Sequence, residues 1–213
     1  MTSALDSVLL RSAELEAALL PFLELPVANT SKRFAATRGM CGVAFEHAES
    51  IKILIGTRNF TSALGLVRLQ YEALVRGLWL LYAAPELSVE KLMGEFSREA
   101  VGNNEKLPMH AEMLNALDGK APRDAMISLL SFKEYQWKPL SSYIHGGVHA
   151  LRRHSDGYPV DLLKQVLRAS NGLSTMVAMV LLLISSDQSK QGFLPSVQMD
   201  FKDCLPEHHP RDL

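Results

Sequence analysis

Apolar residues recur every three or four positions along most of the chain, which is the spacing of one face of an α-helix. The pattern predicts amphipathic helices, separated by connections rich in Pro, Gly and Asn, at residues 2–24, 32–56, 60–84, 88–103, 109–117, 122–137, 139–144 and 160–186. No stretch keeps the alternation of apolar and polar positions that marks a half-buried strand. We therefore expect an all-α fold, a single-domain antiparallel bundle of about six to eight helices.

The length of 213 residues fits one domain. Residues 1–186 are expected to form the helical bundle. Residues 187–213 interrupt the helical pattern with Gly192 and three prolines, so they are expected to form an extended, partly mobile C-terminal tail. The first residues carry acids and lack a basic leader, so no signal peptide is expected.

Composition limits the classes of partner. Apolar residues make up 47% of the chain and charged residues 21%, the balance of an ordinary soluble globular protein. The formal charge of −1 encodes no global attraction to nucleic acid or to an anionic membrane, so an RNA partner would need a local basic patch. Cys41 and Cys204 lie far apart in unlike contexts, which argues against a disulfide framework and favours a cytoplasmic location.

The helix expected at residues 60–84 is apolar almost all round, so it should be central in the domain. It carries Arg68, Glu72 and Arg76, which are spaced by four and therefore lie on one face. This stripe is either the solvated side of a mostly buried helix or the wall of an internal cleft. In a cleft the charges would partly neutralise one another, and one net positive charge would remain to meet an anion.

A second stretch with many side chains that could bind a ligand or take part in catalysis spans residues 138–154, KPLSSYIHGGVHALRRH. His145 and His149 are four apart and would share a face on a continuous helix, a spacing that can bind zinc. Gly146–Gly147 stands where zinc hydrolases place an acid, and no further ligand is near except His154. We therefore predict no metal and no other cofactor.

Acid–base chemistry suits the same stretch better, because imidazole titrates near neutrality. Lys138 and Ser141 stand seven and four positions before His145, on one helix face. The two glycines would let another chain or a substrate approach the imidazole. Alternatively His145 hydrogen-bonds a helix end, and Ser141 and Tyr143 are ordinary helix residues.

The pairing of Arg68-Leu-Gln-Tyr-Glu72 with the later segment Lys138-Pro-Leu-Ser141-Ser-Tyr-Ile-His145-Gly resembles a group of bacterial helical domains of unknown function. That group is loosely related to the HEPN-like superfamily, and the resemblance spans about residues 64–151. It implies a helical bundle that dimerises. The better-known members of the superfamily are metal-independent ribonucleases of toxin–antitoxin and antiphage systems. Their signature is an Arg followed at a short interval by a His, and here Lys138 occupies the Arg position at best.

The resemblance implies a set of roles for residues of both stretches. His145 would act as general base on a ribose 2′-OH or as general acid on the leaving 5′-oxygen. Arg68 or Lys138 would stabilise the charge on the phosphate, and Glu72 would orient Arg68. Contacts to the ligand would come from other polar and basic residues, namely Arg76, Ser141, Tyr143, Arg152 and Arg153.

Residues 169–186 carry no charge, and a membrane span of that length is conceivable. A buried central or dimer-forming helix is the expectation, and we predict no membrane insertion. Small and flexible residues along it would suit close packing of two subunits in an isologous homodimer: Gly172, Ser174, Met176, Ala178 and Met179.

Two function classes follow. The protein is either a non-catalytic module that binds a protein partner or an anionic ligand between residues 60–84 and 138–154, or an HEPN-like ribonuclease. The environment of His145 separates the two hypotheses. A catalytic imidazole should lie in a cleft within reach of Arg68 or Lys138, whereas a structural one should be covered and paired to backbone.

Overall fold

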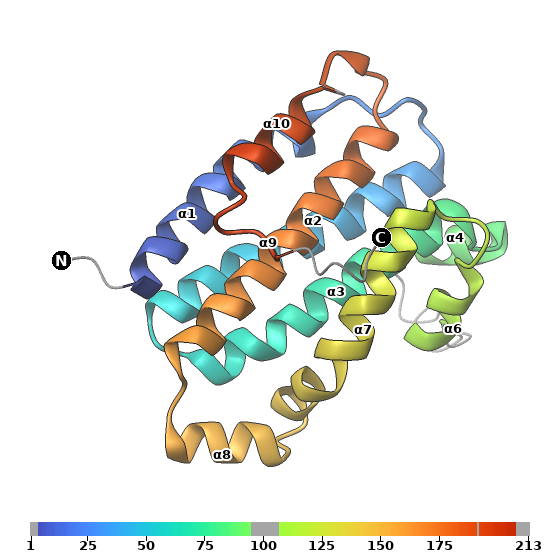
Figure 1. Cartoon of the computed structure of the whole chain (residues 1–213). Coiled ribbons are helices and arrows are strands. Elements are labelled where there is room, and N and C mark those ends of the chain that lie inside the picture. Colours follow the sequence, from blue (N-terminus) through green and yellow to red (C-terminus); the bar gives the residue numbers. More distant parts are fainter. Residues whose placement is uncertain (1–3, 95–106, 191, 208–213) are drawn as a thin grey trace.

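The computed structural model describes residues 4–94, 107–190 and 192–207. This part of the chain is all-α and contains no named strand, which confirms the predicted fold class (Figure 1). In chain order its helices are α1 (Ala4–Leu19), η1 (Leu20–Glu24), α2 (Lys32–Gly56), α3 (Phe60–Tyr82), α4 (Glu86–Leu92), α6 (His110–Ala116), α7 (Arg123–Ile144), α8 (Val148–Asp156), α9 (Val160–Leu183), η2 (Gln188–Lys190) and α10 (Phe193–Asp200). The helix expected at residues 88–103 begins within α4, and its second half lies outside the described residues.

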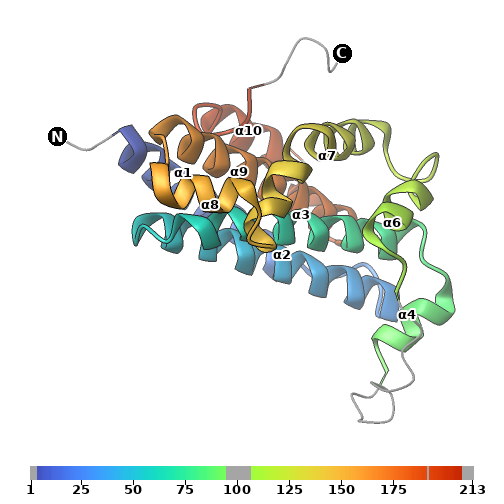
Figure 2. The ribbon, with the colours of Figure 1, turned by 90° about the horizontal axis from the view of Figure 1, so that it is seen from below.

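The bundle is built around α3. Helices α2, α6, α7 and α9 all pack against it, and 13 of its 23 residues are buried. Figures 1 and 2 show α1, α2, α3 and α9 running side by side, with α7 and α8 along one flank and α4 and α6 near the C-terminal end of α3. A helix that is apolar on nearly every side can be buried only in such a position.

Arginines of α2 hold the ends of neighbouring helices. Arg33 donates hydrogen bonds to the carbonyl oxygens of Leu80 and Ala84 at the end of α3, and it pairs with Glu86 at 2.7 Å. Arg38 donates in the same way to two carbonyl oxygens near the end of η1. The last carbonyl groups of a helix have no partner within the helix, so these guanidinium groups satisfy acceptors that would otherwise be left unpaired.

Helix α7 is one continuous element, although the sequence predicts two segments separated before Pro139. A proline inside a helix removes one hydrogen bond to the carbonyl four residues earlier, here that of Tyr135. Tyr135 is exposed, so water can replace the missing N–H donor. The hydrogen bond that Pro139 removes therefore belongs to an exposed residue of the helix.

The two glycines after α7 have a structural explanation. Gly146 has a left-handed backbone with φ of 64°, and the Gly147 N–H donates to the carbonyl oxygen of Ser142 at 2.8 Å, the bond that closes a Schellman motif. The Ser142 Oγ accepts from the N–H of His149 at 2.9 Å, at the start of α8. A Cβ on Gly147 would stand 2.6 Å from that oxygen. His145 and His149 therefore belong to different elements, and the shared face predicted for them does not exist.

Replacing Gly146 with alanine should lower the free energy of unfolding by about 1–2 kcal/mol, because a side chain is strained in the left-handed region. Gly39 of α2 is the matched control, since nothing lies within 4 Å of an added Cβ. Gly39→Ala should raise stability by about 0.5–1 kcal/mol. Urea unfolding of both variants measures this, and equal signs would contradict the explanation.

The C-terminal segment is folded where the sequence predicts an extended tail. Residues 193–200 form α10, and Pro195 stands in its first turn, where a missing N–H costs little. Leu194 and Val197 are buried, and Cys204 is covered completely. We call residues 193–205 the C-terminal strap, because it lies along α1 and α9 (Figure 1).

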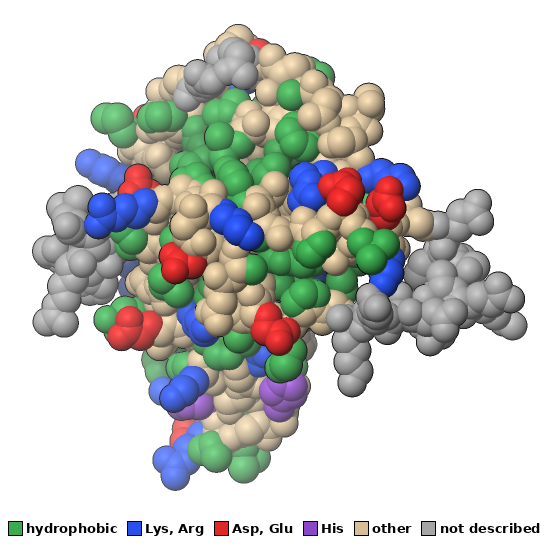
Figure 3. Space-filling view, turned by 90° about the vertical axis from the view of Figure 1, so that its right-hand side faces the viewer, with side chains coloured by type: hydrophobic (Ala, Val, Ile, Leu, Met, Phe, Trp, Pro, Cys, Tyr) green, Lys and Arg blue, Asp and Glu red, His purple; other side chains and the backbone are tan. Residues whose placement is uncertain are grey.

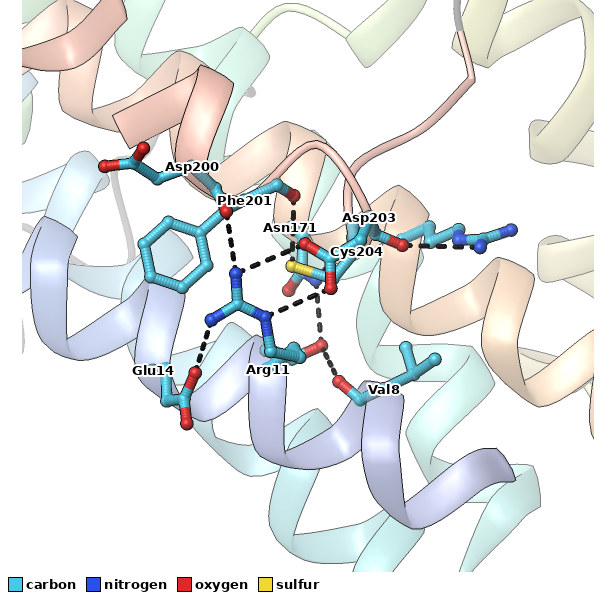
Figure 4. Close-up of polar contacts among 10 residues, drawn as sticks. Val8, Arg11, Glu14, Asn171, Asp200, Phe201, Asp203 and Cys204 are labelled. Atoms are coloured by element: carbon cyan, nitrogen blue, oxygen red, sulfur yellow. Dashed lines mark hydrogen bonds and ion pairs between the residues drawn. The ribbon is translucent and has the colours of Figure 1, made fainter. Parts of the chain in front are cut away.

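Polar side chains of α1 and α9 attach the C-terminal strap (Figure 4), among them Arg168, which donates to the Asp203 carbonyl oxygen at 3.3 Å. Arg11 of α1 bonds Asp203 at 3.0 Å and the carbonyl oxygen of Asp200 at 2.7 Å, and its guanidinium lies 4.4 Å from the centre of the Phe201 ring. Asn171 of α9 is buried, and its Nδ2 donates to Ser12 Oγ and to the Cys204 carbonyl oxygen, each at 2.8 Å.

Helix α9 is the one helix in the described ranges that is long and apolar enough to cross a membrane. In its most apolar window 61% of the residues are buried inside the protein, so the core accounts for much of this apolarity. Ser174 and Ala178 are buried within the chain, and a Cβ on Gly172 would stand 2.8 Å from Pro206 of the same chain. These small residues are thus used inside the protomer, and the homodimer stays a prediction.

Candidate functional site

Four aromatic side chains meet where α3, α6 and α7 come together. Tyr71 of α3 stacks on Phe132 of α7 with 4.4 Å between ring centres, and its hydroxyl donates to the Leu129 carbonyl oxygen at 2.8 Å. His110, the first residue of α6, stacks on Trp137 of α7 at 4.6 Å and lies 5.1 Å from the Tyr71 ring. The rings form one wall of the site.

Arg68 lies against this wall. Its guanidinium carbon is 4.0 Å from the centre of the Trp137 ring, its Nε donates to Glu72 Oε1 at 2.8 Å, and its Nη1 donates to Ser141 Oγ at 2.6 Å. The Ser141 hydroxyl in turn donates to the Trp137 carbonyl oxygen at 2.7 Å. The side chains of Arg68 and Glu72 are only 15% and 26% exposed. The charged stripe of α3 therefore lies against α7 and not in open solvent.

Two buried nitrogen atoms at this place have no hydrogen-bond partner. Among the described residues, four buried side-chain polar atoms lack one, and Arg76 Nε and His110 Nε2 are two of these four. Burial lowers the pKa of His110 to about 4, with the positive charges of Lys133, Arg68 and Arg76 acting in the same direction. The imidazole is therefore neutral at pH 7, in surroundings that are cationic.

We call the set Arg68, Glu72, Arg76, His110, Lys133, Trp137 and Ser141 the α3–α6–α7 site. It combines three cations, of which Arg68 is held by contacts with Glu72, Ser141 and Trp137, with a neutral imidazole and an aromatic wall. A family model for a family of unknown function, DUF6988, matches residues 41–207, which include every residue of the site. The chain belongs to the DUF6988 family. No curated protein and no solved structure matches it.

Membership of DUF6988 confirms the resemblance to a domain family of unknown function. A bacterial origin and a relationship to the HEPN-like superfamily stay predictions. In the part of this DUF6988 protein that the structure describes, no group of three His, Cys, Asp or Glu side chains is placed to hold a metal ion.

Several residues predicted for the site lie elsewhere. His145 ends α7 and is exposed, and so is Lys138. No hydrogen bond or ion pair of the described residues joins His145 to Arg68 or Lys138. The imidazole is thus neither in a cleft with a cation nor covered. The roles predicted for His145 and Lys138 as ribonuclease residues stay untested predictions.

The remaining predicted residues form a separate group around α8. Burial raises the pKa of Tyr143, and a hydrogen bond with Arg153 opposes that rise. Arg152 is exposed on α8 beside this pair. Figure 3 shows histidine and basic side chains gathered at the lower end of the molecule, where Figure 1 places α8. The structure brings Arg68, Glu72 and Ser141 together and leaves the α8 residues outside that site.

Sequence reasoning missed His110, Lys133 and Trp137 of the α3–α6–α7 site. One signal was available, because Lys133, Trp137 and Ser141 repeat the four-residue spacing of the stripe on α3. His110 gave no such signal. It stands alone in a helix of seven residues, and its role depends on where α6 lies against α3 and α7.

Proposed function

We propose that this DUF6988 protein binds a small anionic ligand at the α3–α6–α7 site. The observation that carries the proposal is the pair of buried nitrogens without partners, Arg76 Nε and His110 Nε2. Arg76 Nε always carries a proton, and His110 Nε2 is a donor when it carries the ring proton. A buried donor that is left unpaired costs about 1–3 kcal/mol. An anion with several acceptor oxygens would satisfy such donors and would gain the strength of charge-assisted hydrogen bonds.

The charges around these nitrogens support an anion over a neutral ligand. Among the ion pairs of the described residues, none involves Arg76 or Lys133, whereas Arg68 is paired with Glu72. Glu72, Ser141 and the Trp137 ring fix the Arg68 guanidinium before any ligand arrives. Groups that are already ordered lose little freedom on binding, so more of the interaction energy is retained as affinity.

The chemistry present favours binding over catalysis. An imidazole with a pKa near 4 is a weak base at neutral pH. The Ser141 hydroxyl beside Arg68 already donates to a backbone carbonyl, so it is not poised as a nucleophile. The described side chains of the site thus offer donors and positive charge.

Titrating the protein with inorganic phosphate in a calorimeter tests the proposal. Lys133→Gln removes a cation beside His110 and should weaken binding by roughly tenfold, since a hydrogen bond to a charged group contributes about 1.5–3 kcal/mol. Lys138→Gln is the matched control, because Lys138 lies on the same helix but is exposed. It should bind like the wild type.

Equal weakening in both lysine variants would indicate a general charge effect and would contradict the site. Absence of phosphate binding by the wild type at millimolar concentration would contradict the proposed function. The ribonuclease alternative has its own readout, which is cleavage of RNA in the presence of EDTA by the wild type beside His145→Ala. Cleavage that is lost in this variant would place a catalytic group at His145 and favour the alternative.

A further inference from the structure

We infer that the ligand of the α3–α6–α7 site is a doubly charged oxyanion of the phosphate class, and that its binding is coupled to proton uptake by His110. This inference rests on the proposed function. It goes beyond it by naming the charge and shape of the ligand and the group that responds to it.

The charge balance of the site sets the charge of the ligand. Three cations act on one place, Arg68, Arg76 and Lys133, and Glu72 is the carboxylate paired among them. With a neutral His110, two positive charges remain uncompensated by the described residues. A dianion would neutralise both, whereas a carboxylate would leave one cation in a partly buried place without an opposite charge.

The arrangement of donors sets the shape. Arg76 comes from α3, His110 from α6 and Lys133 from α7, so the donors belong to three different helices. Figure 2 shows α6 and α7 meeting beside the second half of α3. An oxyanion of the phosphate class presents three strong acceptor oxygens as a phosphate monoester, so it can accept from donors that come from several helices. A planar carboxylate offers two oxygens in one plane and matches this arrangement less well.

His110 is the group whose protonation should follow the ligand. The charges that act on it are those of Lys133 from α7 and of Arg68 and Arg76 from α3. The Tyr71 ring of α3 lies 5.1 Å from it, and Glu72 of α3 is paired with Arg68. In the free protein the cations and burial keep the imidazole neutral. When a dianion is bound, the charge nearest to the imidazole is negative, and a negative charge favours the imidazolium. Since the bound form then has the higher pKa, affinity increases as the pH falls from neutral toward the pKa of the free protein.

Sulfate is the probe that isolates this effect, because it keeps both charges between pH 8 and pH 5 while phosphate does not. We expect sulfate affinity to rise severalfold over this range, with proton uptake visible as a dependence of the binding enthalpy on the buffer. In His110→Asn, which can donate a hydrogen bond but cannot titrate, affinity should not change with pH. At pH 8 acetate should bind roughly tenfold more weakly than sulfate.

A second measurement needs no variant. The ring proton signals of His110 in the wild type, followed by NMR as the pH is lowered, should show a higher pKa when sulfate is present. An unchanged pKa, or a pH dependence that persists in His110→Asn, would overturn the proton coupling. Acetate that binds as tightly as sulfate would overturn the dianion and leave the proposed function standing. Failure of both anions to bind would overturn the proposed function itself.

The same titration distinguishes free phosphate from an organic phosphate. A phosphate monoester such as glycerol phosphate adds an uncharged group to the same dianion. Tighter binding of the monoester than of inorganic phosphate at equal pH would identify an organic phosphate as the ligand class. Tighter binding of inorganic phosphate would identify the free ion, and both results support the inferred charge.

Discussion

Replacing Asn171 with leucine is expected to lower the free energy of unfolding by about 2–4 kcal/mol, although the two side chains are similar in size. Asn171 is 4% exposed, and its Nδ2 joins three segments, since it reaches Ser12 of α1 and the Cys204 carbonyl oxygen of the C-terminal strap. Leucine leaves that carbonyl oxygen in an apolar place without a donor, and an unpaired buried acceptor costs more than a hydrogen bond gains.

Urea unfolding measures the loss, and amide hydrogen exchange over residues 193–205 shows whether the C-terminal strap detaches before the bundle unfolds. Gln165→Leu is the matched control, because it also replaces an amide side chain with leucine, at an exposed position of α9, and it should be close to neutral. Arg11→Gln should speed exchange in the same segment with a smaller effect on global stability, because its ion pairs are solvated. Unchanged exchange in Asn171→Leu would contradict the proposed attachment.

The sequence predicts a helix and its bounds well where local residues determine the backbone conformation. The pattern predicts a helix at residues 32–56, and α2 has these bounds, with Ser31 Oγ accepting from the Phe34 N–H at its start. Prolines mislead when they stand where a helix tolerates them. Pro139 lies inside α7, where the carbonyl that loses its donor belongs to the exposed residue Tyr135, and Pro195 lies in the first turn of α10. Neither situation can be read from the neighbouring residues, because it depends on tertiary contacts.

In the candidate site, too, some features follow from local sequence and others depend on tertiary contacts. The four-residue spacing of Arg68, Glu72 and Arg76 predicts one face, and the structure shows that face against α7. Which residues pack against that face depends on the tertiary structure. The sequence therefore directs attention to His145 and misses His110. The Gly146–Gly147 pair, which suggests access for a substrate, serves to end α7 and to start α8.

The variant Arg68→Met is expected to affect both stability and ligand binding. It leaves the Glu72 carboxylate, which is 26% exposed, without its partner, and it removes the cation from the Trp137 ring. Breaking a fully buried pair costs about 3–5 kcal/mol, so about 2 kcal/mol is expected for this partly exposed one. Phosphate affinity should fall by more than roughly tenfold, because the site then keeps one uncompensated positive charge fewer.

Glu72→Gln separates the two roles of Arg68, because it changes them in opposite directions. Stability should fall, since Arg68 loses its carboxylate partner, but phosphate should bind severalfold more tightly, since a negative charge has left the site. In the double variant Arg68→Met/Glu72→Gln the loss of stability should be smaller than the sum of the single losses, by about 1–2 kcal/mol, because the pair no longer leaves one charge alone. Additive losses of stability would contradict the coupling between Arg68 and Glu72. Weaker phosphate binding by Glu72→Gln would contradict the charge argument and would mean that the positioning of Arg68 by Glu72 outweighs the removed negative charge. Tighter phosphate binding by Glu72→Gln together with non-additive stability losses would support both the ion pair of Arg68 with Glu72 and the charge balance of the site.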